Sequence, residues 1–186
     1  MTASETDHLH SQLSRFEDMF PGYRMEIVEG NVVLSPLRAF HAKTIRLVWN
    51  LLESQISPQW ECVSDVLFPF GDGFEFCPDL AVIPAREEAR NLSVYSVELI
   101  ELAIEVVSPS SVRNDYEVKD RQYAARGIAN YLIFDPSRGE VVTRWNPGPT
   151  GYRGTDTFRY GTTVKIDTSV GALTFDTSGL PVDPNA

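Results

Sequence analysis

Two acidic residues stand in stretches of sequence that are otherwise apolar. Glu105 lies inside "LAIEVV", residues 102–107, and Asp79 comes directly before the apolar run "LAVI". Such runs are typical of strands buried on both faces, where an ionised carboxylate is costly unless it is paired, protonated or bound to a cation. Two carboxylates on neighbouring buried strands repel each other, so the pattern predicts that one is protonated or that both share a cation. A hard ion such as Mg²⁺ suits this pair, because it takes carboxylate oxygens and water without any His or Cys ligand.

Each acid also has a purely structural interpretation. Glu105 could form a salt bridge with an arginine. Asp79 could cap the turn at Pro78, a residue that confines this end of the strand to a sheet edge or a bulge. The sequence leaves both interpretations open.

A lysine follows on the helical stretch "NDYEVKDRQYAARG", residues 114–127, which has a capping pattern at both ends. Tyr116, Lys119 and Tyr123 share one face of this helix, and a lysine on a buried face would need an anion from the preceding strand. A rival inward face consists of Val118, Gln122 and Ala125. With that face inward, Lys119 would be exposed and paired with Asp115, four residues earlier. Periodicity alone does not decide between the two faces.

The surrounding patterns predict the elements that position these residues. Leu9, Leu13 and Phe16 recur at helical spacing before Pro21-Gly22. Later stretches predict a hairpin at 23–36, a helix at 39–56, strands at 60–70 and 74–84, a surface loop or short helical turn at 85–93, the Glu105 strand, the helix after it, a hairpin at 130–148, and short strands at 151–180. This order indicates an α/β sandwich with a mixed sheet, in which the helix after Glu105 is the crossover to the next buried strand.

Composition sets further limits. At 186 residues, the chain is expected to fold as one domain. No apolar run approaches the roughly 20 residues of a membrane-spanning helix. The acidic, polar N-terminus resembles neither a signal peptide nor a transit peptide, so a cytoplasmic protein is expected. Cys62 and Cys77 have no zinc-site spacing and are expected to be two buried thiols.

The net charge of −10 argues against a protein that coats nucleic acid, but it does not exclude a nuclease. Positive charge is concentrated in residues 24–50, which hold Arg24, Arg38, Lys43 and Arg46 against two acids. No stripe that combines aromatic and basic residues is evident along the sequence.

Several of these pieces together resemble the Uma2 family, which is similar to the PD-(D/E)xK nuclease superfamily and is described as restriction endonucleases. The resemblance rests on "PD" at 78–79, "IEVVSPS" at 104–110, Asp115, Lys119, Tyr123 and "GIANYLIFDP" at 127–136. The hairpin at 23–36 and His41 also fit the family pattern. The resemblance covers about residues 20–175.

This resemblance implies a restriction-endonuclease-like mixed central sheet flanked by helices, with additional β-hairpins at the C-terminus. It implies a single nuclease domain over residues 1–186, with a core at about 20–175 and flexible ends at 1–8 and 180–186.

The sequence departs from the common superfamily motif at one position. That motif places a lysine two residues after the acid, and here the position holds Val107, which points to the same side of the strand as Glu105. In the Uma2 family the lysine comes from the following helix, which in this sequence is Lys119.

The function implied by the resemblance is metal-assisted hydrolysis of a phosphodiester bond in nucleic acid, with DNA the expected substrate. Asp79, Glu105 and the Val106 carbonyl would hold Mg²⁺, with Mn²⁺ a possible substitute, and Lys119 would orient water or stabilise charge on the phosphate. Glu26 and His41 are outer candidates for which a structural role is the simpler interpretation. A homodimer is expected by analogy.

Three alternatives stay open. The chain could be a non-catalytic binding or assembly module on the nuclease fold, which the valine at 107 favours. It could be a hydrolase built on Ser108 or Ser110 with His41, although no Gly-x-Ser-x-Gly elbow is present. It could be a glycosidase using Asp79 and Glu105 without metal, although a groove of sugar-stacking aromatic residues is not evident.

Overall fold

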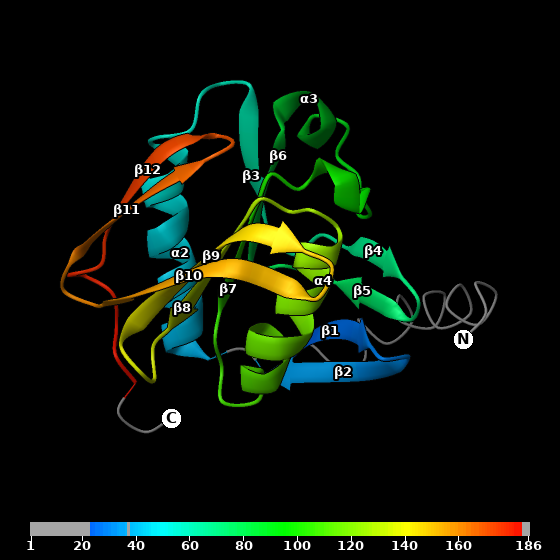
Figure 1. Cartoon of the computed structure of the whole chain (residues 1–186), viewed down its shortest axis with the longest axis horizontal. Coiled ribbons are helices and arrows are strands. Elements are labelled where there is room, and N and C mark those ends of the chain that lie inside the picture. Colours follow the sequence, from blue (N-terminus) through cyan, green and yellow to red (C-terminus); the bar gives the residue numbers. More distant parts are fainter. Residues whose placement is uncertain (1–22, 37, 184–186) are drawn as a thin grey trace.

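The computed structural model describes residues 23–36 and 38–183 and has helices flanking a mixed β-sheet (Figure 1). The helix predicted around residues 9–16 lies outside the described residues. No helix in the described part of the chain is both long and apolar enough to cross a membrane.

The central sheet has six strands in the order β10-β9-β8-β7-β6-β3. Its strands are β3 (Trp60–Val63), β6 (Leu80–Pro84), β7 (Leu102–Val106), β8 (Asn130–Asp135), β9 (Glu140–Gly148) and β10 (Gly151–Arg159). β7 and β8 are parallel, and the other neighbours pair antiparallel. The helical segment between β7 and β8 is therefore a crossover, which confirms the expected mixed sheet.

A second sheet has the order β2-β1-β5-β4. Its strands are β1 (Tyr23–Val28), β2 (Asn31–Pro36), β4 (Phe68–Gly71) and β5 (Phe74–Phe76). The predicted hairpin at 23–36 is confirmed, and its turn residues Glu29 and Gly30 both have positive φ, 51° and 76°. Two successive left-handed residues match the type I′ turns that suit the twist of a two-residue hairpin.

Two strand predictions were wrong in their extent. The stretch 60–70 was expected to be one strand, but it divides into β3 of the central sheet and β4 of the second sheet. The stretch 74–84 divides in the same way into β5 and β6. Asp65, with φ of 56°, interrupts the first stretch, and Pro78, which has no N–H to donate, stands in the gap of the second.

The helices cover opposite faces of the central sheet. α2 (Ala39–Glu53) packs on one face beside the two-stranded sheet of β11 (Thr163–Thr168) and β12 (Gly171–Asp176), which Figure 1 shows next to each other. A π-helical turn, Asn114–Lys119, continues into α4 (Asp120–Ala125) on the other face. The remaining helical pieces are short: α3 (Ala85–Glu88) and a 3₁₀ turn at Val97–Leu99.

The residues of β7 alternate between these two faces. Ile104 and Val106 belong to the core under α2, whereas Ala103 and Val107 belong to the core under α4. Since side chains alternate along a strand, Glu105 points to the α4 side together with Val107, as expected.

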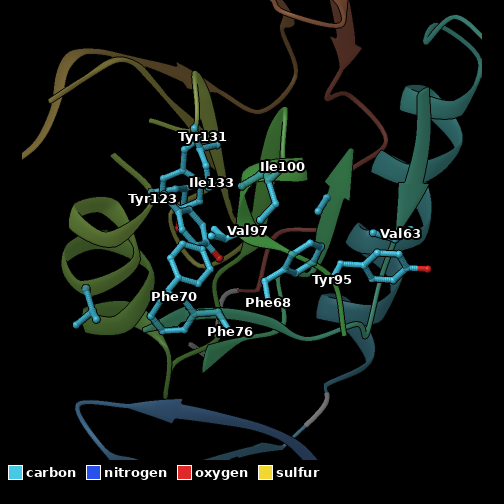
Figure 2. Close-up of a cluster of buried hydrophobic side chains, with 14 of the residues drawn as sticks. Val63, Phe68, Phe70, Phe76, Tyr95, Val97, Ile100, Tyr123, Tyr131 and Ile133 are labelled. Carbon is cyan, nitrogen blue, oxygen red and sulfur yellow. The ribbon is translucent and has the colours of Figure 1, made fainter. Parts of the chain in front are cut away.

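The core under α4 is rich in aromatic side chains. Phe70, Phe76, Tyr123 and Tyr131 lie together in Figure 2, and Tyr123 is 5.3 Å from Phe70 and 4.9 Å from Tyr131 between ring centroids. Figure 2 shows that these rings come from β4, β5, α4 and β8, so the cluster joins the second sheet to the central one. Aromatic pairs at these spacings add stability beyond the area they bury.

The cysteines and the C-terminal tail differ in part from expectation. Both cysteines are thiols, and Cys62 is buried as predicted, but Cys77 is only half-buried. In the tail, Leu180 is buried and the Asp183 N–H donates to the carbonyl of Pro136 at 2.9 Å. Leu180 and Asp183 thus contact the rest of the fold, residues 184–186 lie outside the described residues, and the expected flexible end at 180–186 stays a prediction.

Candidate active site

Asp79 and Glu105 meet across the β6–β7 pair. Leu80 lies opposite Ile104 in the register, so the residues just outside this pair are neighbours on the α4 side of the sheet. The Asp79 N–H is 3.4 Å from Glu105 Oε2, and the Val106 N–H donates to Asp79 Oδ2 at 2.6 Å. Both carboxylates are 1% exposed. The two lone acids of the sequence therefore form a buried pair, as their patterns predicted.

Lys119 reaches this pair from the helical crossover. Its Nζ lies 2.9 Å from Glu105 Oε1 and 2.9 Å from Glu26 Oε1, and its side chain is 2% exposed. Asp115 Oδ1 is 3.5 Å from the same nitrogen, so the i−4 pair considered from the sequence exists but is buried. The alternative of an exposed Lys119 is wrong.

The π-helical turn explains why neither predicted helix face is correct alone. Asp115, Val118 and Lys119 are all buried, whereas Ala125 is exposed and Tyr116 is half-buried. A π-turn has more than four residues per turn, so it brings a different set of positions inward than the α-helical spacing predicts. The turn therefore points Lys119 and Asp115 inward together.

Tyr123 of α4 also holds the Glu105 carboxylate. Its hydroxyl donates to Glu105 Oε1 at 2.7 Å, and its ring lies in the aromatic cluster of Figure 2. Oε1 thus accepts from both Lys119 and Tyr123, which fixes the orientation of the Glu105 carboxylate.

The two outer candidates, Glu26 and His41, both lie at this site. Glu26 of β1 accepts from the Cys77 N–H at 3.2 Å and from Asn114 Nδ2 at 3.3 Å, in addition to its contact with Lys119. His41, in the first turn of α2, places Nε2 3.3 Å from Asp79 Oδ2. The direction of each side chain could not be read from one end of a hairpin or one face of a helix.

The site is dominated by negative charge. We call Glu26, Asp79, Glu105 and Asp115 the acid cluster; all four are at most 5% exposed. Among the described residues, one lysine lies in this cluster, and Lys119 contacts three of the four carboxylates, those of Glu26, Glu105 and Asp115. That excess is unfavourable in a buried site unless protons or a cation balance it.

The pKa values of the cluster follow from this arrangement. Burial raises the pKa of Glu105 well above its usual range, and the neighbouring acids reinforce the effect against the opposing influence of Lys119. Burial likewise raises the pKa of Asp115 to about 6, although Lys119 and the Ser111 hydroxyl oppose the shift. Burial alone would lower the pKa of Lys119, but the surrounding carboxylates outweigh it and raise that pKa well above normal.

The donor chemistry of the site fits a hard divalent cation. Asp79 and Glu105 offer carboxylate oxygens of the kind Mg²⁺ prefers. Within residues 23–36 and 38–183, no group of three or more His, Cys, Asp or Glu side chains is arranged to hold a metal ion. Mg²⁺ commonly binds proteins through one or two carboxylates and keeps several waters. A site made by Asp79 and Glu105 therefore does not require a third side-chain ligand.

The site contains three further residues that the sequence did not predict as part of it. Asp115 contributes a fourth buried carboxylate, Tyr123 contributes its hydroxyl, and the Ser111 hydroxyl donates to Asp115 Oδ2 at 2.5 Å. The signal for Asp115 was its i−4 spacing from Lys119. No comparable signal in the sequence indicated the serine.

The serine-hydrolase alternative gains no support from the geometry. The hydroxyls of Ser108 and Ser110 lie 3.1 Å from each other, and Ser108 also donates to Ser111 at 3.1 Å. His41, in contrast, contacts Asp79. The described residues therefore do not pair a serine nucleophile with this histidine.

Comparisons with known proteins identify the family and the fold of the chain. The chain matches the Uma2 family, described as "Putative restriction endonuclease", over residues 11–178. A crystal structure described as a "putative nuclease belonging to DUF820" from Anabaena variabilis is similar in fold, with a TM-score of 0.63 and 17% sequence identity over 76% of this chain and 80% of that one. A search of curated proteins found no match.

Proposed function

The chain belongs to the Uma2 family, described as putative restriction endonucleases, and from this premise we propose that it is a metal-dependent endonuclease that hydrolyses phosphodiester bonds in nucleic acid, with DNA the expected substrate. The observation that carries the proposal is the buried acid cluster around Lys119. Within the described residues, the four carboxylates outnumber the one ammonium beside them, and a divalent cation would add positive charge to this site.

In this proposal Asp79 and Glu105, with the Val106 carbonyl, would hold Mg²⁺ or Mn²⁺. The ion would supply a Lewis acid for the phosphate and a lowered pKa for bound water. The Val106 N–H fixes Asp79, and the Tyr123 hydroxyl fixes Glu105, so both carboxylates are oriented before any ligand arrives. Preorganisation of this kind avoids rearrangement during the reaction.

Lys119 is the proposed catalytic cation, and Glu26 and Asp115 are its positioning residues. Their carboxylates hold the ammonium beside Glu105, so it remains protonated despite its burial. A protonated lysine at this place can orient a water molecule or stabilise charge on a phosphate. It would take the place of the lysine that Val107 replaces on the strand.

A non-catalytic module on the same fold is the second candidate. It is favoured by Val107, which is 5% exposed and packs in the aromatic core, and by the direct contacts of Lys119 with two carboxylates. In such a protein the lysine would neutralise the cluster for stability, and no substrate would be turned over.

Calorimetric titration with Mg²⁺ and Mn²⁺, followed by a cleavage assay on DNA and RNA, tests the proposal. We expect the parent protein to bind metal and to cleave nucleic acid only when metal is present. Asp79→Asn and Glu105→Gln should lose both properties, whereas Lys119→Ala should keep metal binding and lose cleavage. Metal binding without cleavage of any nucleic acid would favour the non-catalytic module, and unchanged cleavage by Lys119→Ala would refute the role of the lysine.

A further inference from the structure

A pocket of about 450 Å³ lies along α2, next to the acid cluster. Its lining comprises His41, Ala42, Ile45, Arg46, Trp49 and Asn50 of α2, with Ser64 and Asp65 after β3. We call it the α2 pocket. Its size is in the range of sites for small molecules and cofactors, which combine apolar walls with a few polar groups.

The α2 pocket adjoins the acid cluster through one side chain. His41 lines the pocket, and its Nε2 is 3.3 Å from Asp79 Oδ2. The other ring nitrogen, Nδ1, is buried and has no hydrogen-bond partner among the described residues. A ligand in the pocket would therefore lie one side chain away from the proposed metal ligands, with an unsatisfied polar group between them.

The chemistry of the lining suits a flat, partly polar ligand. Ile45 and the half-buried indole of Trp49 supply apolar surface, and Asn50 and Ser64 supply hydrogen-bonding groups beside it. Aromatic side chains stack on nucleobases, and amide and hydroxyl groups bond to base edges.

The charge around the pocket suits a ligand that carries phosphate. α2 has Lys43 and Arg46 on its exposed surface and no acidic residue before Glu53. In the described part of the chain, neither Lys43 nor Arg46 takes part in an ion pair. Arg46 belongs to the pocket lining together with one acidic residue, Asp65, and Lys43 lies on the same helix outside the lining.

The folded helix also brings a basic and an aromatic side chain together at the pocket. Arg46 and Trp49 are three residues apart, so they are neighbours on the helix, and both line the pocket, whereas Phe40 lies on the opposite side of the helix from Trp49. Surfaces that bind single-stranded nucleic acid typically combine basic groups along the sugar-phosphate backbone with aromatic side chains on which the bases stack.

We infer that the α2 pocket is a nucleobase subsite, which receives an unpaired base of the substrate strand while Lys43 and Arg46 contact the flanking phosphates. The inference rests on the proposed nuclease function and narrows its substrate. A base within a duplex is stacked and paired, so only a single-stranded or flipped base can enter such a pocket. Because His41 lines the pocket and contacts Asp79, a strand bound there would pass close to the acid cluster.

Binding measured without divalent metal tests the subsite separately from cleavage. The probes are a fluorescein-labelled oligothymidylate of about 12 nucleotides and a duplex of the same length, titrated in EDTA and followed by fluorescence anisotropy. Ala42→Met fills the pocket from an exposed helical position. Ala39→Met makes the same change on the same helix at an exposed position outside the lining, and is the matched control.

We expect the parent to prefer the single strand, Ala42→Met to weaken its binding by about 5- to 100-fold, and Ala39→Met to bind as the parent does. Trp49→Leu should weaken it over the same range, with circular dichroism showing that the fold is retained. Equal binding by Ala42→Met and Ala39→Met, or a preference of the parent for the duplex, would overturn the inference.

Failure of the subsite differs from failure of the nuclease proposal. A parent that cleaves duplex with Mg²⁺ but shows no pocket-dependent binding of single strands would keep the nuclease function and lose the subsite. A parent that binds single strands through the α2 pocket but never cleaves them would keep a nucleic-acid-binding pocket and lose the catalytic proposal.

Discussion

At the scale of single residues, Asp79 has two roles that separate variants can distinguish. Its Oδ2 accepts from the buried Val106 N–H, and its negative charge adds to the acid cluster. Loss of the acceptor leaves a buried donor unpaired, which costs about 1–3 kcal/mol, whereas loss of the charge alone relieves repulsion.

We therefore expect Asp79→Ala to lower the free energy of unfolding of the metal-free protein by about 1–3 kcal/mol, and Asp79→Asn to leave it unchanged or raise it. Urea denaturation in EDTA measures both values. Equal destabilisation by the two variants would mean that the carboxylate charge itself is needed for folding.

Lys119 is the residue whose loss should be most harmful to stability. It contacts Glu26 and Glu105 at 2.9 Å inside a buried site, and removal of one partner from a buried ion pair typically costs about 3–5 kcal/mol. We expect Lys119→Met, which keeps most of the volume, to lose stability of this order near pH 7.5.

The loss should be smaller near pH 5, because protons can then neutralise the carboxylates that Lys119 no longer balances. Denaturation of the variant and the parent at both pH values measures this difference. A loss that does not depend on pH would indicate that Lys119 acts through packing, for instance on Phe76, whose ring centroid is 5.7 Å from Nζ.

Sequence reasoning was strongest for residues whose environment is set by their immediate neighbours. Asp79 and Glu105 are flanked by apolar residues on the chain, so their burial could be predicted before their contact was known. Glu26 and His41 lie in ordinary amphipathic patterns, and their direction depends on how a hairpin and a helix pack on the sheet. That information comes from residues far away in the sequence.

At the scale of elements, breaks within strands explain which thiol is accessible. Cys62 lies within β3, and burial raises the pKa of its thiol far above the usual range. Cys77 lies in the gap between β5 and β6 that Pro78 maintains, and it is half-buried. The thiolate is the reactive form of cysteine. Burial therefore protects Cys62 in two ways, because it keeps reagents away from the sulfur and keeps the thiol protonated.

We expect iodoacetamide near pH 8 to modify Cys77 well before Cys62, and a Cys77→Ser variant to resist modification until denaturant is added. Peptide mass spectrometry of the alkylated protein locates the modified residue. Rapid modification of Cys62 in the native Cys77→Ser protein would show that the β3 edge of the sheet opens readily.

The elements themselves were partly predictable. The 23–36 hairpin, the helix that became α2 and the crossover between β7 and β8 were clear because each has its own period and turn residues. The division of 60–70 and 74–84 between two sheets was missed, since both halves of each stretch have the same strand pattern. The π-turn was missed because the helix is short, and one extra residue in a turn does not visibly change the spacing of so few apolar residues.

At the scale of the whole molecule, net charge and local charge act differently. The net charge of −10 disfavours long-range attraction of nucleic acid, whereas Lys43 and Arg46 are two exposed positive charges on α2. A homodimer, expected from the family resemblance, stays a prediction that analytical ultracentrifugation can test.

The same balance of charge predicts how metal and pH together control the stability of the molecule. Burial raises the pKa of Asp115 to about 6 and that of Glu105 well above its usual range. An acid with a raised pKa in the folded state holds its proton more tightly there than in the unfolded chain. Stability from these two groups is therefore greatest below the unfolded pKa and falls as the pH rises through the folded pKa.

A divalent cation at the acid cluster would replace those protons as the neutralising charge. We expect Mg²⁺ to raise the melting temperature of the parent near pH 7.5 and to raise it much less near pH 5, where protons already occupy the site. At a metal concentration of 100 times Kd, the expected increase in the free energy of unfolding is about 2.7 kcal/mol. Differential scanning calorimetry at matched ionic strength measures it, with Glu105→Gln as the variant that should gain nothing. An equal gain in the parent and in Glu105→Gln would place the ion elsewhere on this acidic protein and leave the acid cluster to be neutralised by protons and Lys119 alone.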